Sequence, residues 1–124
     1  MAELETVKIG PVTFDTEFVY DLKDVRDDGT WRSLHGRISY TECVIRIEAE
    51  QNLDVMRITV LHEAIHAILD YAGQHKYTEE QVEALGVGVY ALLKENPALV
   101  RWLGLWPDLV PPPAAEVSDG NTGD

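Results

Sequence analysis

The chain has few of the features that mark secreted or membrane-bound proteins. Its only cysteine is Cys43, so no disulfide can form within it, which suits a reducing compartment. No apolar run approaches the ~20 residues that a transmembrane helix needs, and the first residues lack the basic-then-apolar pattern of a signal peptide. We therefore expect a cytoplasmic protein that does not bind a membrane, with Cys43 as a small core residue.

Basic residues are also scarce. The sequence has 10 Lys and Arg against 22 Asp and Glu, which gives a formal net charge of −12. A surface of this kind repels the phosphates of nucleic acids and of anionic lipids, so we expect no nucleic-acid partner. The acidity does not by itself identify a substrate.

The length of 124 residues is enough for one hydrophobic core but not for two. The chain contains no internal repeat. Its last part is rich in proline and acidic residues, a composition typical of disorder. The sequence therefore predicts one folded domain over residues 1–106 and a disordered tail over residues 107–124.

Residues 60–71 contain the pattern H-E-x-x-H inside an apolar run. On a helix, residues four apart lie one above the other, so the imidazoles of His62 and His66 can bind the same metal ion. Glu63 lies about 100° around the helix from His62, beside the metal rather than on it. A carboxylate there can take a proton from a metal-bound water, so the pattern predicts a zinc hydrolase site.

Chance matches to this pattern occur, and an amphipathic helix with two histidines four apart is the simpler structural interpretation. The flanking residues here are apolar on several faces, as in a buried central helix: Ile58, Leu61, Ile65, Ile68, Leu69 and Ala72. Two imidazoles and a carboxylate in such a helix need a shared partner, and a metal ion is one. Asp70 can orient the ring of His66 from four residues on, although a solvated acid at a helix end is the plainer interpretation.

Short β-type segments precede this helix. One pair is expected around the turn at Gly10 and Pro11, and a second pair over residues 34–40 and 43–48. In the last segment Cys43, Ile45 and Ile47 alternate with more polar positions. We expect an α+β fold whose small, mostly antiparallel sheet of three or four strands packs on the helix.

Two helices are expected after these strands. The first covers about residues 53–72, with Asn52 or Asp54 as its N-cap and Gly73 as its C-terminal stop. The second begins at the capping-box sequence T-E-E-Q and extends to about residue 95. Its predicted core stripe consists of Val82, Leu85, Val89, Leu92 and Leu93.

A catalytic zinc ion typically takes three protein ligands and a water molecule, so a third ligand should lie elsewhere in the chain. Measured around the second helix from the middle of its predicted stripe, Glu79 lies about 60° away, Glu83 about 100° and Glu80 about 160°. Glu79 thus points most nearly into the core and is the preferred ligand. Glu83 is placed to accept a hydrogen bond from a ligand histidine, and Gly86 on the same flank allows close helix approach.

These segments together resemble the small phage- and prophage-encoded ImmA/IrrE-like metallopeptidases, a branch of the gluzincin-type zinc peptidases. The matching stretches are V-K-I-G, H-G-R-I-S-Y, C-V-I-R-I, V-L-H-E-A-I-H-A-I-L, and E-E-Q-V-E-A-L-G with K-E-N-P, which cover most of residues 7–97. The second helix of that group has the pattern E-x-x-x-N/D-x-F/L-A/G, whose first Glu, here Glu79, is the third ligand. Glu83 stands where Asn or Asp is usual, so an exchange of roles between Glu79 and Glu83 stays open.

The resemblance implies a zincin-like core that holds Zn²⁺ between the two helices through His62, His66 and Glu79, with Glu63 as general base. It implies a protein or peptide substrate that adds as an extended strand at the sheet edge. If the protein is phage-encoded, it would act in the host cytoplasm.

Several questions stay open at this point. The candidate donors to the oxyanion are Tyr71, Tyr77, His35 and His75. One alternative is a catalytically idle zinc protein that acts in phage assembly or interaction. The other is an acidic interaction module that binds no metal.

Overall fold

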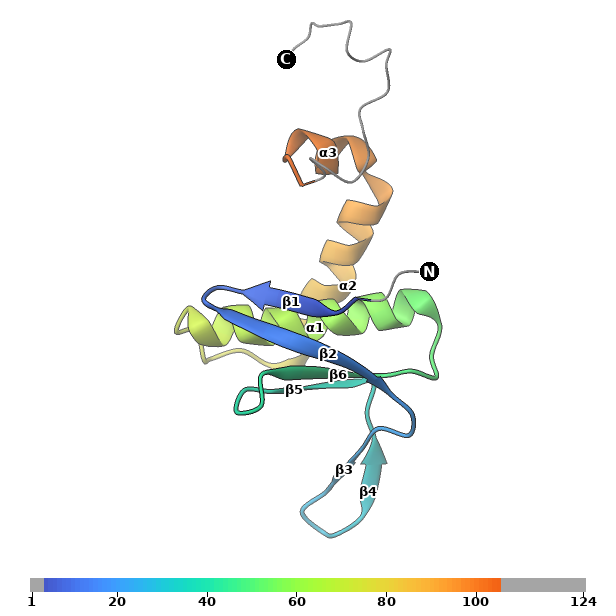
Figure 1. Cartoon of the computed structure of the whole chain (residues 1–124). Coiled ribbons are helices and arrows are strands. Elements are labelled where there is room, and N and C mark those ends of the chain that lie inside the picture. Colours follow the sequence, from blue (N-terminus) through green and yellow to red (C-terminus); the bar gives the residue numbers. More distant parts are fainter. Residues whose placement is uncertain (1–3, 106–124) are drawn as a thin grey trace, which may run out of the picture. The chain divides into compact units, whose positions relative to one another are not determined.

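The computed structural model describes residues 4–105, and the chain divides into two compact units whose boundary in the sequence is between Tyr90 and Ala91. The predicted tail over residues 107–124 lies outside the described residues. In chain order (Figure 1), the elements are β1 (Thr6–Ile9), β2 (Val12–Val19), β3 (Lys23–Val25), β4 (Trp31–Ser33), β5 (Gly36–Ser39), β6 (Val44–Glu48), α1 (Leu53–Tyr71), α2 (Glu79–Glu95) and α3 (Pro97–Trp102).

The main sheet has four strands in the order β1-β2-β6-β5. Both predicted pairs are present and antiparallel, β1 with β2 and β5 with β6, but β2 and β6 pair in parallel. The four-stranded sheet is therefore mostly antiparallel, as the sequence predicts, but the parallel central pairing makes it mixed. The connection from β2 to β5 carries a separate hairpin, β3 with β4, and β6 then runs beside β2 in the same direction.

The start of β6 differs from the predicted alternation. Cys43 has a φ of 56° and lies in the turn before the strand, where it packs half-buried against the core. Val44 is 8% exposed, so it is buried as well, although it lies on the opposite face from Ile45. The alternation holds for Ile45 and Ile47, which are fully buried.

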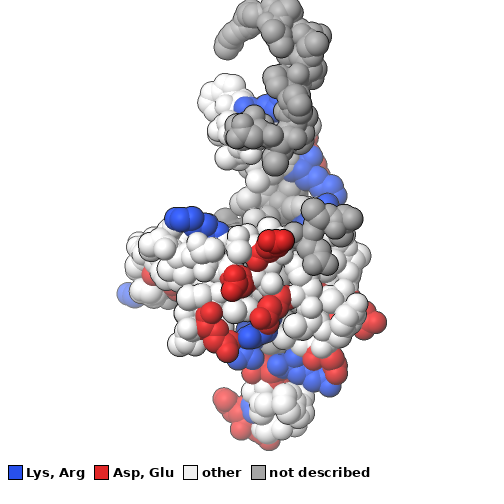
Figure 2. Space-filling view, in the orientation of Figure 1, with Lys and Arg blue, Asp and Glu red and all other residues white. Residues whose placement is uncertain are grey.

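The hydrophobic core lies between one face of the sheet and α1 (Figure 1). Phe14, Ile45 and Ile47 come from the sheet, and the small side chains of Ala64 and Ala67 allow α1 to lie close to it. The opposite face of the sheet carries charges, among them Arg46 with its two acidic partners Glu17 (3.0 Å) and Glu42 (2.8 Å). In Figure 2, acidic side chains are spread over the visible face, with basic side chains next to some of them.

Neither helix is buried as the sequence predicts. The buried residues of α1 are Thr59, Glu63, Ala64 and Ala67, whereas Ile68 is 52% exposed, so α1 is covered on one side only. In α2 the buried residues are Val82 and Gly86. Leu85 and Leu92 of the predicted stripe are exposed. In the part of α2 up to Tyr90, the residues buried against the rest of the first unit are only Val82 and Gly86, which leaves Leu85 outside the packed line.

Within residues 4–105, no helix combines the length and apolar character needed to cross a membrane.

Candidate metal centre

Helix α1 presents the two histidines side by side. Asn52 caps its first turn, since the Oδ1 atom accepts a hydrogen bond from the Val55 N–H at 2.9 Å. One turn apart within the helix, the rings of His62 and His66 have centroids separated by 5.0 Å. Their side chains are 17% and 15% exposed, so both rings are largely withdrawn from solvent while the Nε2 atoms remain accessible to a shared partner.

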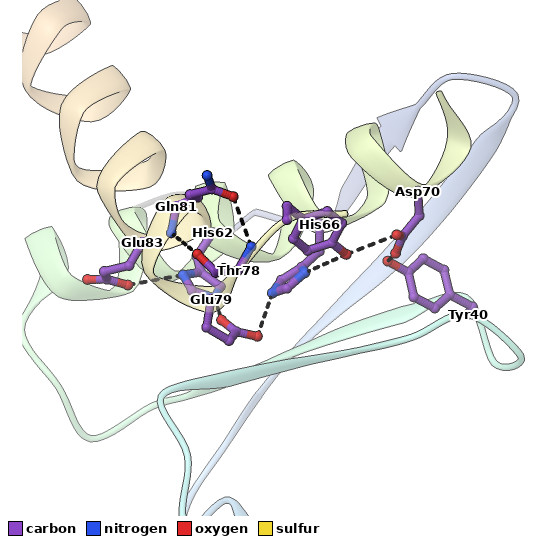
Figure 3. A network of polar contacts seen from close by, with 9 residues as sticks. Tyr40, His62, His66, Asp70, Thr78, Glu79, Gln81 and Glu83 are labelled. Atoms are coloured by element: carbon purple, nitrogen blue, oxygen red, sulfur yellow. Dashed lines mark hydrogen bonds and ion pairs between the residues drawn. The ribbon is translucent and has the colours of Figure 1, made fainter. Parts of the chain in front are cut away.

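Glu79 supplies that shared partner. Its Oε1 atom lies 3.0 Å from Nε2 of His62, and its Oε2 atom lies 3.0 Å from Nε2 of His66 (Figure 3). The predicted capping box fixes the start of α2, because the Gln81 N–H donates to the Thr78 hydroxyl at 3.0 Å and the Thr78 N–H donates to the Gln81 side chain at 2.9 Å. The side chain of Glu79 is 71% exposed, so it does not point into the core as the helix geometry predicts. It contacts the two histidines of α1 from the solvent side instead.

These three residues fit a zinc ion. One ligand atom from each of His62, His66 and Glu79 lies within 4.8 Å of the other two. Zinc bonds of about 2.0–2.1 Å in tetrahedral geometry separate neighbouring ligand atoms by about 3.3 Å, and the two contacts between an Nε2 atom and a Glu79 oxygen, at 3.0 Å each, are close to that separation. Two imidazoles and one carboxylate are also a donor set that leaves a position for water.

Behind the first histidine lies a carboxylate. Nδ1 of His62 is 3.0 Å from Oε1 of Glu83, which directs the other ring nitrogen toward Glu79. Glu83 thus occupies the hydrogen-bonding position that the sequence suggests. Glu79 contacts both Nε2 atoms and Glu83 contacts the far side of one ring, so the geometry favours Glu79 as the ligand.

Behind the second histidine lies a tyrosine. Nδ1 of His66 is 3.1 Å from the Tyr77 hydroxyl, which donates to Oδ1 of Asp70 at 2.9 Å. Asp70 therefore reaches His66 through Tyr77 and not directly. With a side chain only 27% exposed, it is also not the freely solvated acid of the plainer interpretation. The Tyr40 hydroxyl donates to the second oxygen of Asp70 at 2.6 Å (Figure 3). The sequence gives no signal for Tyr40, which lies 30 positions away.

The hydrogen bonds of this group shift its acidities. Donation from the Tyr40 hydroxyl, and then from that of Tyr77, lowers the pKa of the Asp70 carboxyl and keeps it ionised. Desolvation, followed by the hydrogen bond to Asp70, raises the pKa of Tyr77 to about 12. Tyr77 is thus a neutral donor whose proton is directed at Asp70.

Glu63 is the buried carboxylate of the site, with only 8% of its surface exposed. Burial raises its pKa to about 7, to which Glu79 adds, while the neighbouring His62 acts in the opposite direction. The edge strand β5 approaches closely at Gly36, where a Cβ atom would lie 3.5 Å from Oε2 of Glu63 and would overlap the methyl group of Thr59. Only glycine allows this approach, which excludes bulk water from one side of Glu63.

A cleft of about 760 Å³ opens in front of these groups. Its walls include the ligand set and Glu63, the apolar residues Leu34, Val55, Ile58 and Val87, and the basic residues Arg32 and Arg37. Of the candidate oxyanion donors, His35 and Tyr77 line the cleft, whereas Tyr71 and His75 do not. Tyr77 already donates its proton to Asp70, and the His35 ring is held by Gln51 at 2.8 Å.

The arrangement places three residues that could hold a metal ion beside a buried carboxyl group whose pKa is raised to about 7, and metal-assisted hydrolysis requires this combination of groups. Comparison with models of known protein families, with curated protein sequences and with solved structures found no match. The case for a function therefore depends on the geometry of the site and on the sequence motifs that build it.

Proposed function

We propose that the protein is a zinc-dependent peptidase that cleaves peptide bonds in a protein or peptide substrate. The observation that carries this proposal is the meeting of both Nε2 atoms at Glu79, with the buried carboxylate of Glu63 one residue along the helix from His62. The resemblance to the ImmA/IrrE-like metallopeptidases supports the same assignment. It extends the proposal to a zincin-like core and to a phage-encoded enzyme that acts in the host cytoplasm.

In this proposal His62, His66 and Glu79 hold the metal. When bound there, zinc supplies Lewis-acid activation of a water molecule and of the scissile carbonyl. Glu63 accepts the proton of the attacking water and passes it to the leaving amine. Its pKa of about 7 suits both directions of this transfer, because a carboxyl group titrating near the working pH can accept and release a proton readily.

The edge strand β5 supports the proposed mode of substrate binding. It is the last strand of the sheet on the side of the cleft, so its outer backbone groups can pair with an extended peptide. Gly36 brings this edge next to Glu63, which would align a scissile bond with the general base. Leu34, Val55 and Ile58 offer an apolar wall for a neighbouring side chain of the substrate.

A second candidate is a zinc-binding protein without catalytic activity that acts in phage assembly or interaction. Exposed apolar side chains at the end of the described chain favour an interaction role, since Trp102 is 82% and Leu105 57% exposed. In that case zinc would serve stability alone, and Glu63 would have no chemical task.

Metal analysis combined with proteolysis separates the two candidates. Wild type and Glu63→Gln are purified untagged, their zinc content is measured by elemental mass spectrometry, and both are incubated with unfolded casein and a peptide library. A peptidase should bind about one zinc per chain in both forms and lose about 10²–10⁴-fold in turnover in the variant. Equal behaviour of the two forms supports the idle zinc protein. Failure of the wild type to bind added zinc overturns both.

A further inference from the structure

A chain of contacts behind His66 links residues that the proposed mechanism does not use. From the ring outward, it passes from Nδ1 of His66 to the Tyr77 hydroxyl (3.1 Å) and on to Oδ1 of Asp70 (2.9 Å). The second oxygen of Asp70 accepts from Tyr40 (2.6 Å), and His75 lies 3.4 Å from the first. Asp70 is thus the acceptor on which the surrounding polar groups converge.

The members of this chain come from different parts of the fold. Asp70 lies in the last turn of α1, Tyr77 lies two residues before the start of α2, and Tyr40 follows β5. The Tyr40 ring is itself held by the core, since it packs edge-on against the fully buried Phe14 with centroids 6.3 Å apart. The carboxylate of Asp70 is therefore fixed from the sheet as well as from its own helix.

The positions of the protons in this series of contacts can be assigned. The Tyr77 hydroxyl has one proton, which it donates in a hydrogen bond to Asp70, so its oxygen is free to accept a hydrogen bond from Nδ1–H of His66. A ring that carries its proton on Nδ1 presents the lone pair of Nε2 to the metal position. The Tyr77 ring also lies against that of His66, with centroids 5.4 Å apart. The tilt and the tautomer of the imidazole are both set from this side.

The same tyrosine lies next to the third ligand in sequence. Only Thr78 separates Tyr77 from Glu79, and residues 74–78 have no regular secondary structure of their own. A hydrogen bond that holds Tyr77 on α1 therefore also restricts how far the first residue of α2 can lie from the end of α1. Since the side chain of Glu79 is largely exposed, packing does little to place it, and the position of its backbone matters more.

We propose that Asp70 is a positioning residue that acts through Tyr77 on two ligands at once: the imidazole of His66 and, two residues along the chain, the carboxylate of Glu79. This inference depends on the proposed metal site. The new element is that a contact at the C-terminal end of α1 positions two of the three ligands. Neither Asp70 nor Tyr77 touches the metal position itself. His62, whose outer partner is Glu83, is outside this control.

Three conservative variants test the proposal. Tyr77→Phe keeps the ring against His66 but removes the hydroxyl, and Asp70→Asn removes the charge that orients it. Tyr71→Phe is the matched control, because Tyr71 belongs to the same aromatic cluster, 6.0 Å from the Tyr40 ring, and its hydroxyl takes no part in the chain of contacts. Zinc affinity is measured by competition with a chromophoric chelator, and the ligand field is followed in the visible spectrum of the cobalt(II)-loaded protein.

The two test variants should weaken zinc binding about 10–100-fold and alter the cobalt spectrum, while Tyr71→Phe behaves as wild type. The double variant should be no weaker than the more affected single variant, because both substitutions interrupt one path. Affinity and spectrum unchanged in Tyr77→Phe would overturn the inference even if the wild type is an active zinc peptidase.

A second readout needs no metal. Hydrogen–deuterium exchange of the metal-free protein reports directly on residues 74–79, whose amides should exchange faster in Tyr77→Phe and Asp70→Asn than in Tyr71→Phe. Unchanged exchange in this segment would overturn the link to Glu79 whether or not the protein binds zinc. A wild type that takes up no zinc would overturn the proposed function. Faster exchange in the variants would even then support the role of the Asp70–Tyr77 contact in positioning Glu79.

Discussion

The two histidines of α1 are alike on the side that faces Glu79 and different on the side that faces away. Each Nε2 atom lies 3.0 Å from one oxygen of Glu79, and the two side chains are almost equally buried. The Nδ1 atom of His62 meets a carboxylate directly, at 3.0 Å, whereas that of His66 meets a neutral hydroxyl, at 3.1 Å, with a carboxylate behind it.

If the two histidines hold a metal ion as proposed, their outer partners prepare them for it in two different ways. A directly bonded carboxylate raises the basicity of the imidazole, but Glu83 is 61% exposed and solvent screens its charge. Asp70 is only 27% exposed and accepts hydrogen bonds from two phenols, so its position is better defined than that of Glu83. It reaches its histidine only through the hydroxyl of Tyr77. We infer that Glu83 affects His62 mainly through its charge, to the extent that solvent leaves it unscreened. Asp70 affects His66 mainly by fixing the orientation of its ring.

The largest effect should come from removing what the two histidines share. Glu79→Ala deletes the carboxylate that meets both Nε2 atoms, so we expect the loss of stoichiometric zinc in elemental mass spectrometry. Glu80→Ala is the matched control, because it removes the same group from the adjacent position. Retention of zinc by Glu79→Ala together with its loss in Glu83→Ala would mean that the two glutamates exchange roles.

A second large effect should appear in the pH dependence of stability. It comes from Glu63, the neighbour of His62. The pKa of Glu63 is about 7 in the folded protein against 4.5 as the ordinary value, so the folded form holds a proton that the unfolded form releases between these values. The free energy of unfolding of the metal-free protein should therefore fall as the pH rises through this window, by up to about 3 kcal/mol.

Urea denaturation at several pH values measures this slope. Glu63→Gln cannot titrate at this position and should lack the slope. Its free energy of unfolding should therefore rise relative to that of the wild type as the pH increases. His62→Ala should widen the window, because His62 is the neighbour that lowers the pKa of Glu63. Parallel pH profiles for wild type and Glu63→Gln would contradict the raised pKa.

The distinction between charge and orientation predicts different responses to salt. Glu83→Gln keeps the size and one acceptor oxygen but removes the charge, and it should weaken zinc binding about 10-fold at low ionic strength. Because Glu83 is exposed, this deficit should shrink at about 1 M salt, where screening is nearly complete within a few ångströms. The deficit of Tyr77→Phe should not depend on salt. Equal salt dependence of both variants would remove the distinction.

Much of the site follows from local sequence patterns, because helix geometry relates residues that are close in the chain. The H-E-x-x-H pattern, the cap at Asn52 and the capping box at Thr78 all depend on neighbours within one turn, and the two helices that they mark lie where the sequence predicts them. The angles of Glu79 and Glu83 around α2 likewise favour Glu79 as the residue that meets both Nε2 atoms.

Contacts between distant segments are where the sequence is silent or misleading. The parallel pairing of β2 with β6 depends on how the chain crosses between them, which no periodicity encodes. Tyr40 reaches Asp70 from another element, and no spacing rule connects the two. The predicted stripe of α2 fails at Leu85 because apolar residues alone do not reveal which narrow line of a helix is packed.

The smallest effects should come from the glycine that sets the distance between α2 and His62. A Cβ atom at Gly86 would lie 3.5 Å from the backbone nitrogen of His62, an ordinary contact, whereas at Gly88 it would meet nothing within 4 Å. Gly88→Ala should therefore stabilise the protein by about 0.5–1 kcal/mol through helix propensity alone, and Gly86→Ala by a similar amount or less. The difference in their urea midpoints measures how closely the helices pack at this point.

A larger side chain at the same position tests whether the two histidines are held independently. Gly86→Val should push α2 away from His62 and destabilise the protein by about 1–3 kcal/mol. The contact of Glu83 with His62 should loosen. The Tyr77–Asp70 contact should persist, because Tyr77 precedes α2 in the chain. Hydrogen exchange of residues 74–79 should then stay as in wild type. Faster exchange there would mean that the placement of α2, and not Asp70, holds the second histidine.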